Sequence, residues 1–249
     1  MINPMDLSGK HVIITGASSG IGRATCIQAS KLGAKISLIA RKEEKLRETI
    51  SMMDGEGHKF FPYDLNNLDG IEELISQIVT KNGSIDGLVH SAGIGFNRPV
   101  KMSIAEINSQ IMQINYYAFV EIIRAASNKK RTNLNASYVG VSSVSSLRGF
   151  RAQGLYAASK GAMNALVHPF AKELASKGIR VNTVVFGMVD TDMYKEFIAT
   201  GGNKEELLRD QFAGIIPVEY AANAICFLLS DVSKYMTGGT FNYDAGILS

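Results

Sequence analysis

The sequence has 249 residues, of which 46% are hydrophobic, and its formal net charge at pH 7 is +3. This length suits one large domain that buries about 70–75% of the surface of the unfolded chain. The mild charge comes without a clustered basic face, which does not favour nucleic-acid binding, and no apolar run approaches the roughly 18 residues of a membrane-spanning helix.

Strand patterns and helix patterns alternate from one end of the chain to the other. Strands are predicted at His11–Thr15, Lys35–Ala40, Lys59–Tyr63, Gly87–Ser91, Ala136–Ser142, Arg180–Val185 and Thr240–Tyr243. Helices are predicted at Ile21–Leu32, Glu43–Met53, Leu68–Lys81, Ile104–Ser127, Tyr156–Ser176 and Glu219–Leu229. Pro169 is expected to kink the fifth helix. The alternation predicts a single α/β, Rossmann-like doubly wound domain over residues 1–249, with a seven-stranded parallel sheet and helices on both faces.

Cysteine and histidine usage bears on metal binding and on compartment. Cys26 and Cys226 fall in separate helix patterns and are expected to be buried apolar side chains. The four histidines have no spacing typical of metal ligands, so no metal site is expected. Because the N-terminus also lacks the apolar segment of a signal peptide, we expect a cytoplasmic protein.

Three glycines follow the first predicted strand in the spacing Gly16-x-x-x-Gly20-x-Gly22, and a helix pattern follows them. Glycine permits a tight turn and lets a pyrophosphate approach the backbone. The helix N-terminus adds free N–H groups and a positive dipole end, so the stretch predicts an anion site. The spacing differs from the common Gly-x-Gly-x-x-Gly fingerprint. Taken alone, it also fits a plain strand-to-helix turn.

In such a sheet, ligands bind beyond the carboxyl ends of the strands. The segments that directly follow the second to sixth predicted strands are therefore candidate ligand-binding segments, in addition to the glycine turn after the first. They are residues 40–42, 63–65, 90–93, 142–143 and 186–191.

The end of the second predicted strand bears on the choice between nicotinamide cofactors. NAD sites usually carry an acidic residue about 20 residues past the glycine turn, where it binds the ribose 2′-hydroxyl. Arg41 and Lys42 stand there instead, and a guanidinium would bind a 2′-phosphate through charge-assisted hydrogen bonds. The sequence thus favours NADP(H) over NAD(H). Alternatively, these two cations begin a solvated helix with Glu43 and Glu44.

Tyr156 and Lys160 are four residues apart at the start of a predicted helix, so their side chains share a face. A free phenol has a pKa of about 10, which a nearby cation lowers. A tyrosine tuned in this way can act as the general acid for reduction of a carbonyl. Ser143, after the fifth strand, can hold the substrate oxygen beside the phenol. The neighbouring serines at 142, 145 and 146 are rivals for that role, with loop lining as their alternative.

The chain resembles the short-chain dehydrogenase/reductase family over essentially its whole length, and within it the 3-oxoacyl-carrier-protein reductase-like members. The resemblance is carried jointly by Thr15-Gly16-Ala17-Ser18-Ser19-Gly20-Ile21-Gly22, Ser91-Ala92-Gly93, Asn115, Ser143, Tyr156-x-x-x-Lys160 and Val189-x-Thr191. Two positions depart from the family pattern. His90-Ser91 replaces the usual Asn-Asn, which should change the hydrogen bonds that brace the central strands. Phe186 replaces a proline, which should leave the following loop more mobile.

The resemblance implies hydride transfer between a nicotinamide cofactor and a carbonyl or secondary alcohol. Tyr156 would be the acid/base and Ser143 would hold the reacting oxygen. Lys160 would bind the nicotinamide ribose and lower the tyrosine pKa, while Asn115 would support a proton-relay water. Alternatively, Asn115 is a helix-surface or helix-packing amide, since side-chain amides commonly satisfy buried backbone groups. The implied cofactor contacts are Gly16, Ser18, Ser19, Gly20, Ile21, Gly22, Arg41, Asp64, Leu65, Ser91, Ala92, Gly93, Tyr156, Lys160, Gly187, Val189 and Thr191. Of these, Asp64 and Leu65 would line the adenine and Thr191 would bind the carboxamide.

The family commonly forms tetramers through the helices that here hold Asn115 and Tyr156, so the resemblance also implies a homotetramer. The segment 187–217 is long and largely apolar, which indicates a substrate lid, or a segment that packs on the domain or on another subunit. By resemblance the substrate is a 3-oxoacyl thioester, and sugar, steroid and polyol carbonyls are alternatives. A non-catalytic NADP(H)-binding regulator would require a broken Ser–Tyr–Lys set, and the set here is intact.

Overall fold

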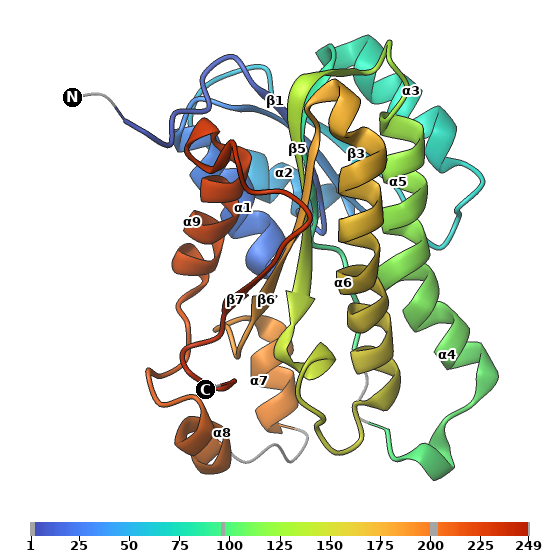
Figure 1. The fold of residues 1–249 in the computed structure, drawn as a ribbon, viewed down its shortest axis with the longest axis vertical. Helices are drawn as coiled ribbons and strands as arrows, with labels where there is room; N and C mark the ends of the chain where they lie inside the picture. The colour runs from blue at the N-terminus through green and yellow to red at the C-terminus, as the bar shows by residue number, and fades with distance from the viewer. Residues whose placement is uncertain (1–2, 96–97, 200–203, 249) are drawn as a thin grey trace.

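Seven parallel strands form one sheet in the computed structural model, which describes residues 3–95, 98–199 and 204–248 (Figure 1). The strands are β1 (His11–Thr15), β2 (Lys35–Ala40), β3 (Lys59–Pro62), β4 (Ile85–His90), β5 (Thr132–Ser143), β6 (Arg180–Phe186) and β7 (Thr240–Tyr243). Their order across the sheet is β3-β2-β1-β4-β5-β6-β7, and each neighbouring pair is parallel. The predicted α/β doubly wound fold is confirmed. Because the order reverses between β1 and β4, a crevice is expected at their carboxyl ends.

Helices cover both faces of the sheet. The helices α1 (Gly20–Lys31), α2 (Glu43–Ile50) and α9 (Val218–Leu229) bury one apolar layer with the sheet. The helices α3 (Ile71–Asn82), α5 (Ala118–Ala126) and α6 (Gly154–Leu174) bury a second layer on the other face (Figure 1). Strands β1 and β6 are buried along their whole length, as expected for a parallel sheet covered on both sides. Cys26 and Cys226 are buried and free, as predicted.

Several predicted helix boundaries differ from the structure. The expected helix 104–127 is divided into α4 (Ala105–Met112) and α5 by a π-helical turn at Gln113–Tyr117. The segment 187–217, for which no helix was expected, contains α7 (Asp192–Ala199) and α8 (Lys204–Asp210). Helix α6 begins two residues before Tyr156 and continues through Pro169. Among the described residues, no helix combines the length and hydropathy that crossing a bilayer requires.

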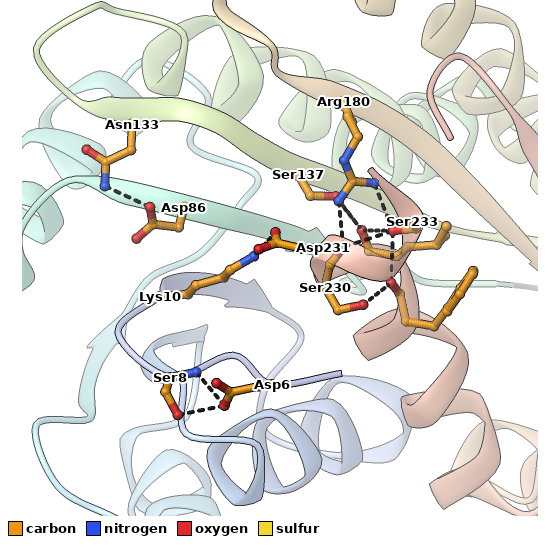
Figure 2. A network of polar contacts seen from close by, with 12 residues as sticks. Asp6, Ser8, Lys10, Asp86, Asn133, Ser137, Arg180, Ser230, Asp231 and Ser233 are labelled. Atoms are coloured by element: carbon orange, nitrogen blue, oxygen red, sulfur yellow. Dashed lines mark hydrogen bonds and ion pairs between the residues drawn. The ribbon is translucent and has the colours of Figure 1, made fainter. Parts of the chain in front are cut away.

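A buried arginine joins α9 to the sheet at the end opposite to the crevice. Arg180 begins β6 and is 6% exposed. Its guanidinium donates to the carbonyl oxygens of Leu228 at 2.8 Å and Ser230 at 3.1 Å, and to the Ser233 hydroxyl at 3.0 Å (Figure 2). These carbonyls lie at the C-terminus of α9, where helix carbonyls lack intrahelical partners and the dipole favours a cation. This polar network joins the C-terminus of α9 to the start of β6. The candidate site lies at the opposite end of the strands, beyond their carboxyl ends.

Candidate active site

A cavity of about 640 Å³ lies along the carboxyl ends of the central strands. The glycine turn after β1, the ends of β2 to β6 and the first turns of α6 and α7 all contribute to its lining. Of the predicted catalytic and cofactor residues, all but Gly22 and Asn115 line it. The tertiary structure therefore brings together residues from 16 to 191 that the sequence places far apart.

The glycine turn is tight and presses against the end of β4. A Cβ at Gly16, where φ is +67°, would lie 2.7 Å from the backbone nitrogen of Ala92. A Cβ at Gly22 would lie 2.3 Å from the Gly16 carbonyl oxygen, so Gly22 serves the packing of α1 on the turn rather than the cavity wall. Helix α1 begins at Gly20 with its N-terminus at the cavity. This geometry matches the predicted anion site.

A second hollow of about 270 Å³ adjoins the glycine turn at the carboxyl end of β2. Arg41 lines both hollows. The other residues of the smaller hollow are mostly cations and hydroxyls: Ser18, Ser19, Arg23, Lys42, Lys45 and Asp192. The guanidinium of Arg23 is engaged by the Ser18 carbonyl and by Glu48. The hollow is therefore basic overall, with one carboxylate on its wall.

His90, one of the two departures from the family pattern, bridges the glycine turn to the helix that follows β4. Its Nε2 lies 3.0 Å from the Ile114 carbonyl oxygen and its Nδ1 lies 3.1 Å from the Thr15 hydroxyl. Since a carbonyl only accepts, Nε2 carries the proton and the Thr15 hydroxyl donates to Nδ1. The same Thr15 oxygen accepts from the Ala92 N–H at 3.1 Å. Burial lowers the pKa of His90 to about 3 and keeps its ring neutral.

Asn115 lies in the π-helical turn and is fully buried. Its Oδ1 accepts from the Ile94 N–H at 2.8 Å, and its Nδ2 donates to the Ile94 carbonyl at 2.9 Å and to the Ser159 hydroxyl at 3.0 Å. The amide therefore braces the chain just after Gly93, against α6. These three bonds engage both ends of the side-chain amide, as expected of a packing amide. The contact with a relay water stays a prediction.

Tyr156 is the centre of the predicted catalytic set. The Ser143 hydroxyl acts to lower its pKa, and the Nζ of Lys160 lies 5.8 Å from the centre of its ring. Lys160 is 3% exposed and donates to the Val141 carbonyl at 2.7 Å. Burial lowers the pKa of Lys160 to about 8. The arrangement places a hydroxyl, a phenol and an amine of reduced pKa on one wall of the cavity.

The predicted fall in the pKa of Tyr156 counts on the charge of the nicotinamide as well as on Lys160, and it stays a prediction. Among the protein's own groups, burial raises the pKa of this phenol, and Ser143 offsets only part of the rise. The reason is that the low-dielectric site penalises a phenolate more than the neighbouring side chains stabilise it.

Among the four serines between 142 and 146, the structure favours Ser143 as the partner of Tyr156. The Ser142 hydroxyl lies 3.4 Å from the Lys160 carbonyl oxygen, and the Ser146 hydroxyl donates to the Ser143 carbonyl at 2.6 Å. Ser145 donates to Gln153 at 2.6 Å. Of these, Ser143 is the serine that affects the pKa of the phenol. No sequence signal singled out Ser145 and Gln153 as a bonded pair, because a loop separates them.

Sequence reasoning also missed Gln211, which is fully buried. Its amide bonds both backbone groups of Met188 and the Gly214 carbonyl, and a Cβ at Gly187 would lie 2.5 Å from its Oε1. A backbone bridge joins Val189 to Ile216 alongside. These bonds join the two ends of the predicted lid to each other. The greater mobility expected after Phe186 stays a prediction.

Comparison with known proteins places this geometry in a family. The profile described as Enoyl-(Acyl carrier protein) reductase matches residues 16–248. A 3-oxoacyl-(acyl-carrier-protein) reductase of Thermotoga maritima is 33% identical to the chain, over 98% of the chain and 100% of the relative. The chain belongs to the short-chain dehydrogenase/reductase family. As a member, it is an oxidoreductase of the class that acts on CH–OH or C=O groups with a nicotinamide cofactor.

Other members of the family have different substrates and share the same fold. An L-xylulose reductase of Caenorhabditis elegans is 29% identical, over 97% of this chain and 96% of its own. A blue fluorescent protein from a metagenomic library, solved in complex with NADPH, superposes with a TM-score of 0.90. It is 26% identical, and the match covers 98% of this chain and all of that one. The fold of the chain is therefore shared with a protein solved in complex with NADPH.

Proposed function

We propose that this chain uses NADPH to reduce a ketone to a secondary alcohol, with 3-oxoacyl thioesters as the first substrate class to test. The observation that carries the proposal is that Ser143, Tyr156 and Lys160 line the same crevice, with Lys160 one helical turn from Tyr156 and its Nζ 5.8 Å from the tyrosine ring. A phenol, a hydroxyl and a buried amine are the groups that carbonyl reduction needs at one point.

The residues of the crevice fit a nicotinamide dinucleotide. Gly16, Gly20 and the two serines between them line the crevice with the backbone of a tight turn, which a pyrophosphate can approach closely. The N-terminus of α1 would hold the pyrophosphate, Asp64 and Leu65 would line the adenine, and Thr191 would bind the carboxamide. When bound, the cofactor supplies hydride to a carbonyl carbon, or accepts it in the reverse direction.

Each catalytic side chain has one task in the proposed reaction. Tyr156 donates its proton to the oxygen of the developing alkoxide, and the Ser143 hydroxyl stabilises that same oxygen. Lys160 exchanges its bond to the Val141 carbonyl for the nicotinamide ribose, so that its charge lies close to the phenol and lowers the tyrosine pKa. Asn115 holds Ile94 and the end of β4 in place.

The preference for NADP(H) is supported by the basic hollow next to the glycine turn. A 2′-phosphate there would meet Arg41, Lys42 and Lys45 together with two serine hydroxyls. The carboxylate of Asp192 on the same wall opposes this preference but is outnumbered by the cations. Such cations bind a phosphate through charge-assisted hydrogen bonds. The relative solved with NADPH supports the same choice.

The substrate end of the cavity is largely apolar. Met188, Met193, Tyr194 and Phe197 line it, and three of these four come from α7. An aliphatic chain next to the reacting carbonyl suits this lining, and α7 and α8 together would form the lid over it. Sugar, polyol and steroid ketones are the alternative substrates within the family. L-xylulose is the specific sugar to test, because an L-xylulose reductase is among the relatives.

The proposed quaternary structure is a homotetramer built on the faces of α4, α5 and α6. Exposed apolar side chains next to α4 and α5 support it. Ile104 is 51% exposed just before α4, and Tyr117 is 48% exposed just before α5. Light scattering coupled to size-exclusion chromatography tests it: a monomeric mass at micromolar concentration would refute it.

A substrate panel tests the proposed activity. The purified chain is mixed with NADPH or NADH and with acetoacetyl-coenzyme A, L-xylulose or a 3-oxosteroid, and cofactor oxidation is followed by absorbance. We expect the fastest oxidation with NADPH and the 3-oxoacyl thioester. If NADPH binds and no carbonyl is reduced, the chain is instead a non-catalytic NADP(H)-binding regulator.

A further inference from the structure

The hydroxyl of Ser143 belongs to a short chain of hydrogen bonds that leads away from Tyr156. The Ser145 backbone N–H donates to the Ser143 oxygen at 3.2 Å, and the two serine oxygens also lie 3.2 Å apart. The Ser145 hydroxyl in turn donates to Oε1 of Gln153 at 2.6 Å. Ser145 is 4% exposed, so its hydroxyl takes its partners from the protein.

The direction of each proton in this chain follows from what each group can donate. The amide oxygen of Gln153 only accepts, so the proton of Ser145 points to Gln153. The Ser145 oxygen then offers only lone pairs, and Ser143 must donate its own proton to it. With that proton engaged, the Ser143 oxygen accepts from the Ser145 N–H and has no proton left to donate toward Tyr156.

We infer that Ser145 and Gln153 are positioning residues for the proposed reduction, because together they keep the Ser143 proton directed away from Tyr156. The inference rests on the proposed function for its role in catalysis. At 3.2 Å the Ser143–Ser145 bond is longer than the usual 2.7–2.8 Å of a hydroxyl pair. A proton held this weakly passes readily to a stronger acceptor, and the oxygen of a developing alkoxide is one. Tyr156 meanwhile keeps its proton for the same oxygen.

The chain of hydrogen bonds also has a consequence for the acidity of Tyr156. A hydroxyl that donates to the phenolate stabilises the charged form, whereas one that only accepts stabilises the neutral phenol. In the native chain, Ser143 can donate to the phenolate only by leaving Ser145. Removing the acceptor at Ser145 frees that proton. Removing Gln153 lets Ser145 donate to Ser143, which reverses the chain and has the same effect on Tyr156.

Other charged groups around the phenol are unchanged by these substitutions. Lys160 of α6 is the cation beside the ring. Arg98, after β4, and Asp192 and Glu196 of α7 are the further charged residues on this part of the cavity lining. Because each stays in place, a change in the acid dissociation constant of Tyr156 reports the direction of the Ser143 proton.

Direct titration of Tyr156 tests the inference without any substrate. The ultraviolet phenolate spectrum is recorded against pH for the wild type, Ser145→Ala and Gln153→Met, and each is corrected with the same protein carrying Tyr156→Phe. We expect both variants to raise the acid dissociation constant of Tyr156 on the order of tenfold, as one redirected hydrogen bond would. Ser145→Thr, which keeps the hydroxyl, should restore the wild-type value.

Ser146→Ala is the matched control. Its hydroxyl comes from the same turn, but it contacts the Ser143 carbonyl and Asn164 rather than the Ser143 hydroxyl. It should leave the titration of Tyr156 unchanged. Equal acid dissociation constants in the wild type, Ser145→Ala and Gln153→Met, or a fall in either variant, would overturn the inference.

A kinetic measurement then tests the positioning role. With NADPH and acetoacetyl-coenzyme A, Ser145→Ala should lower kcat about tenfold, leave the Kd of NADPH unchanged and move the high-pH loss of activity to lower pH. A fall in kcat without that move would point to a structural role and count against the inference. If the wild type reduces no carbonyl, the proposed function fails, while the titration still decides the direction of the proton.

Discussion

Gln211 pairs with both backbone groups of Met188: its Oε1 accepts from the Met188 N–H at 2.6 Å, and its Nε2 donates to the Met188 carbonyl at 3.0 Å. A third bond joins the same amide to the Gly214 carbonyl at 2.7 Å. One buried side chain thus holds the segment after β6, which carries Thr191, against the segment that leads into α9. The cofactor side and the lid side of the cavity are coupled through it.

Gln211→Leu should therefore weaken cofactor binding more than it slows the chemical step. The substitution removes the partners of the Met188 N–H and the Gly214 carbonyl, at up to about 1–3 kcal/mol for each group left unpaired, while the Met188 carbonyl keeps its bond from the Ile216 N–H. We expect the KM of NADPH to rise about tenfold and the melting temperature to fall. A variant with wild-type KM and melting temperature would show that these bonds do not fix the loop.

Tyr156→Phe should abolish most turnover and leave cofactor binding intact. The phenol is the proposed proton donor, and loss of a general acid costs about 10²–10⁴ in rate. Steady-state kinetics and fluorescence titration with NADPH measure the two quantities. Tyr138→Phe is the control, because the Tyr138 hydroxyl bonds Thr132 in the core, far along β5 from the site. Turnover near wild type in Tyr156→Phe would refute the assignment.

Arg41→Asp should change the choice of cofactor. A carboxylate at the end of β2 repels a 2′-phosphate and accepts a hydrogen bond from a 2′-hydroxyl. We expect the Kd of NADPH to rise about 10–100-fold and that of NADH to change little or fall. Arg47→Asp is the matched control, because Arg47 lies on α2, 64% exposed, and pairs with Glu43. An unchanged Kd for NADPH in Arg41→Asp would contradict the proposed NADP(H) preference.

His90 should make the free energy of unfolding depend on pH below about 6.5. Its pKa is about 3 in the folded chain, against about 6.5 when unfolded. Below the unfolded value, the unfolded chain therefore binds more protons. Stability is full above about pH 6.5 and falls by about 1.4 kcal/mol per pH unit toward the folded pKa.

His90→Asn provides the comparison, since it removes the titrating group and restores the residue type usual in the family. Urea unfolding between about pH 6.5 and 4.5 should lose about 2–3 kcal/mol less stability in the variant than in the wild type. Burial also lowers the pKa of His11, so part of the pH dependence should remain. Identical slopes in the two proteins would show that His90 is not the proton-linked group.

Sequence periodicity was sufficient to predict the sheet because its strands are buried on both faces and read as continuous apolar runs, as in β1 and β6. It was insufficient for the helix around Asn115. The turn at Gln113–Tyr117 is π-helical, with i→i+5 hydrogen bonds in place of i→i+4, and the apolar spacing had predicted one uninterrupted helix there.

The candidate site, like the fold, was predictable from the sequence only in part. Gly16 and the pair Tyr156 and Lys160 were predictable, because a glycine turn and a one-turn helix spacing are local geometries that sequence spacing encodes. The pKa direction of Tyr156 was not, since it depends on burial that arises only when the cavity wall is assembled.

The amino-acid sequence by itself determined the parallel α/β fold, the family and the residues at the strand ends, because apolar periodicity and short-range spacing are set by local backbone geometry. The tertiary structure alone decided that Ser145 pairs with Gln153, that His90 joins Thr15 to the π-helical turn at Ile114, and that Gln211 binds the backbone of Met188. Hydrogen bonds between distant segments depend on packing in three dimensions, and no local pattern in a chain specifies them.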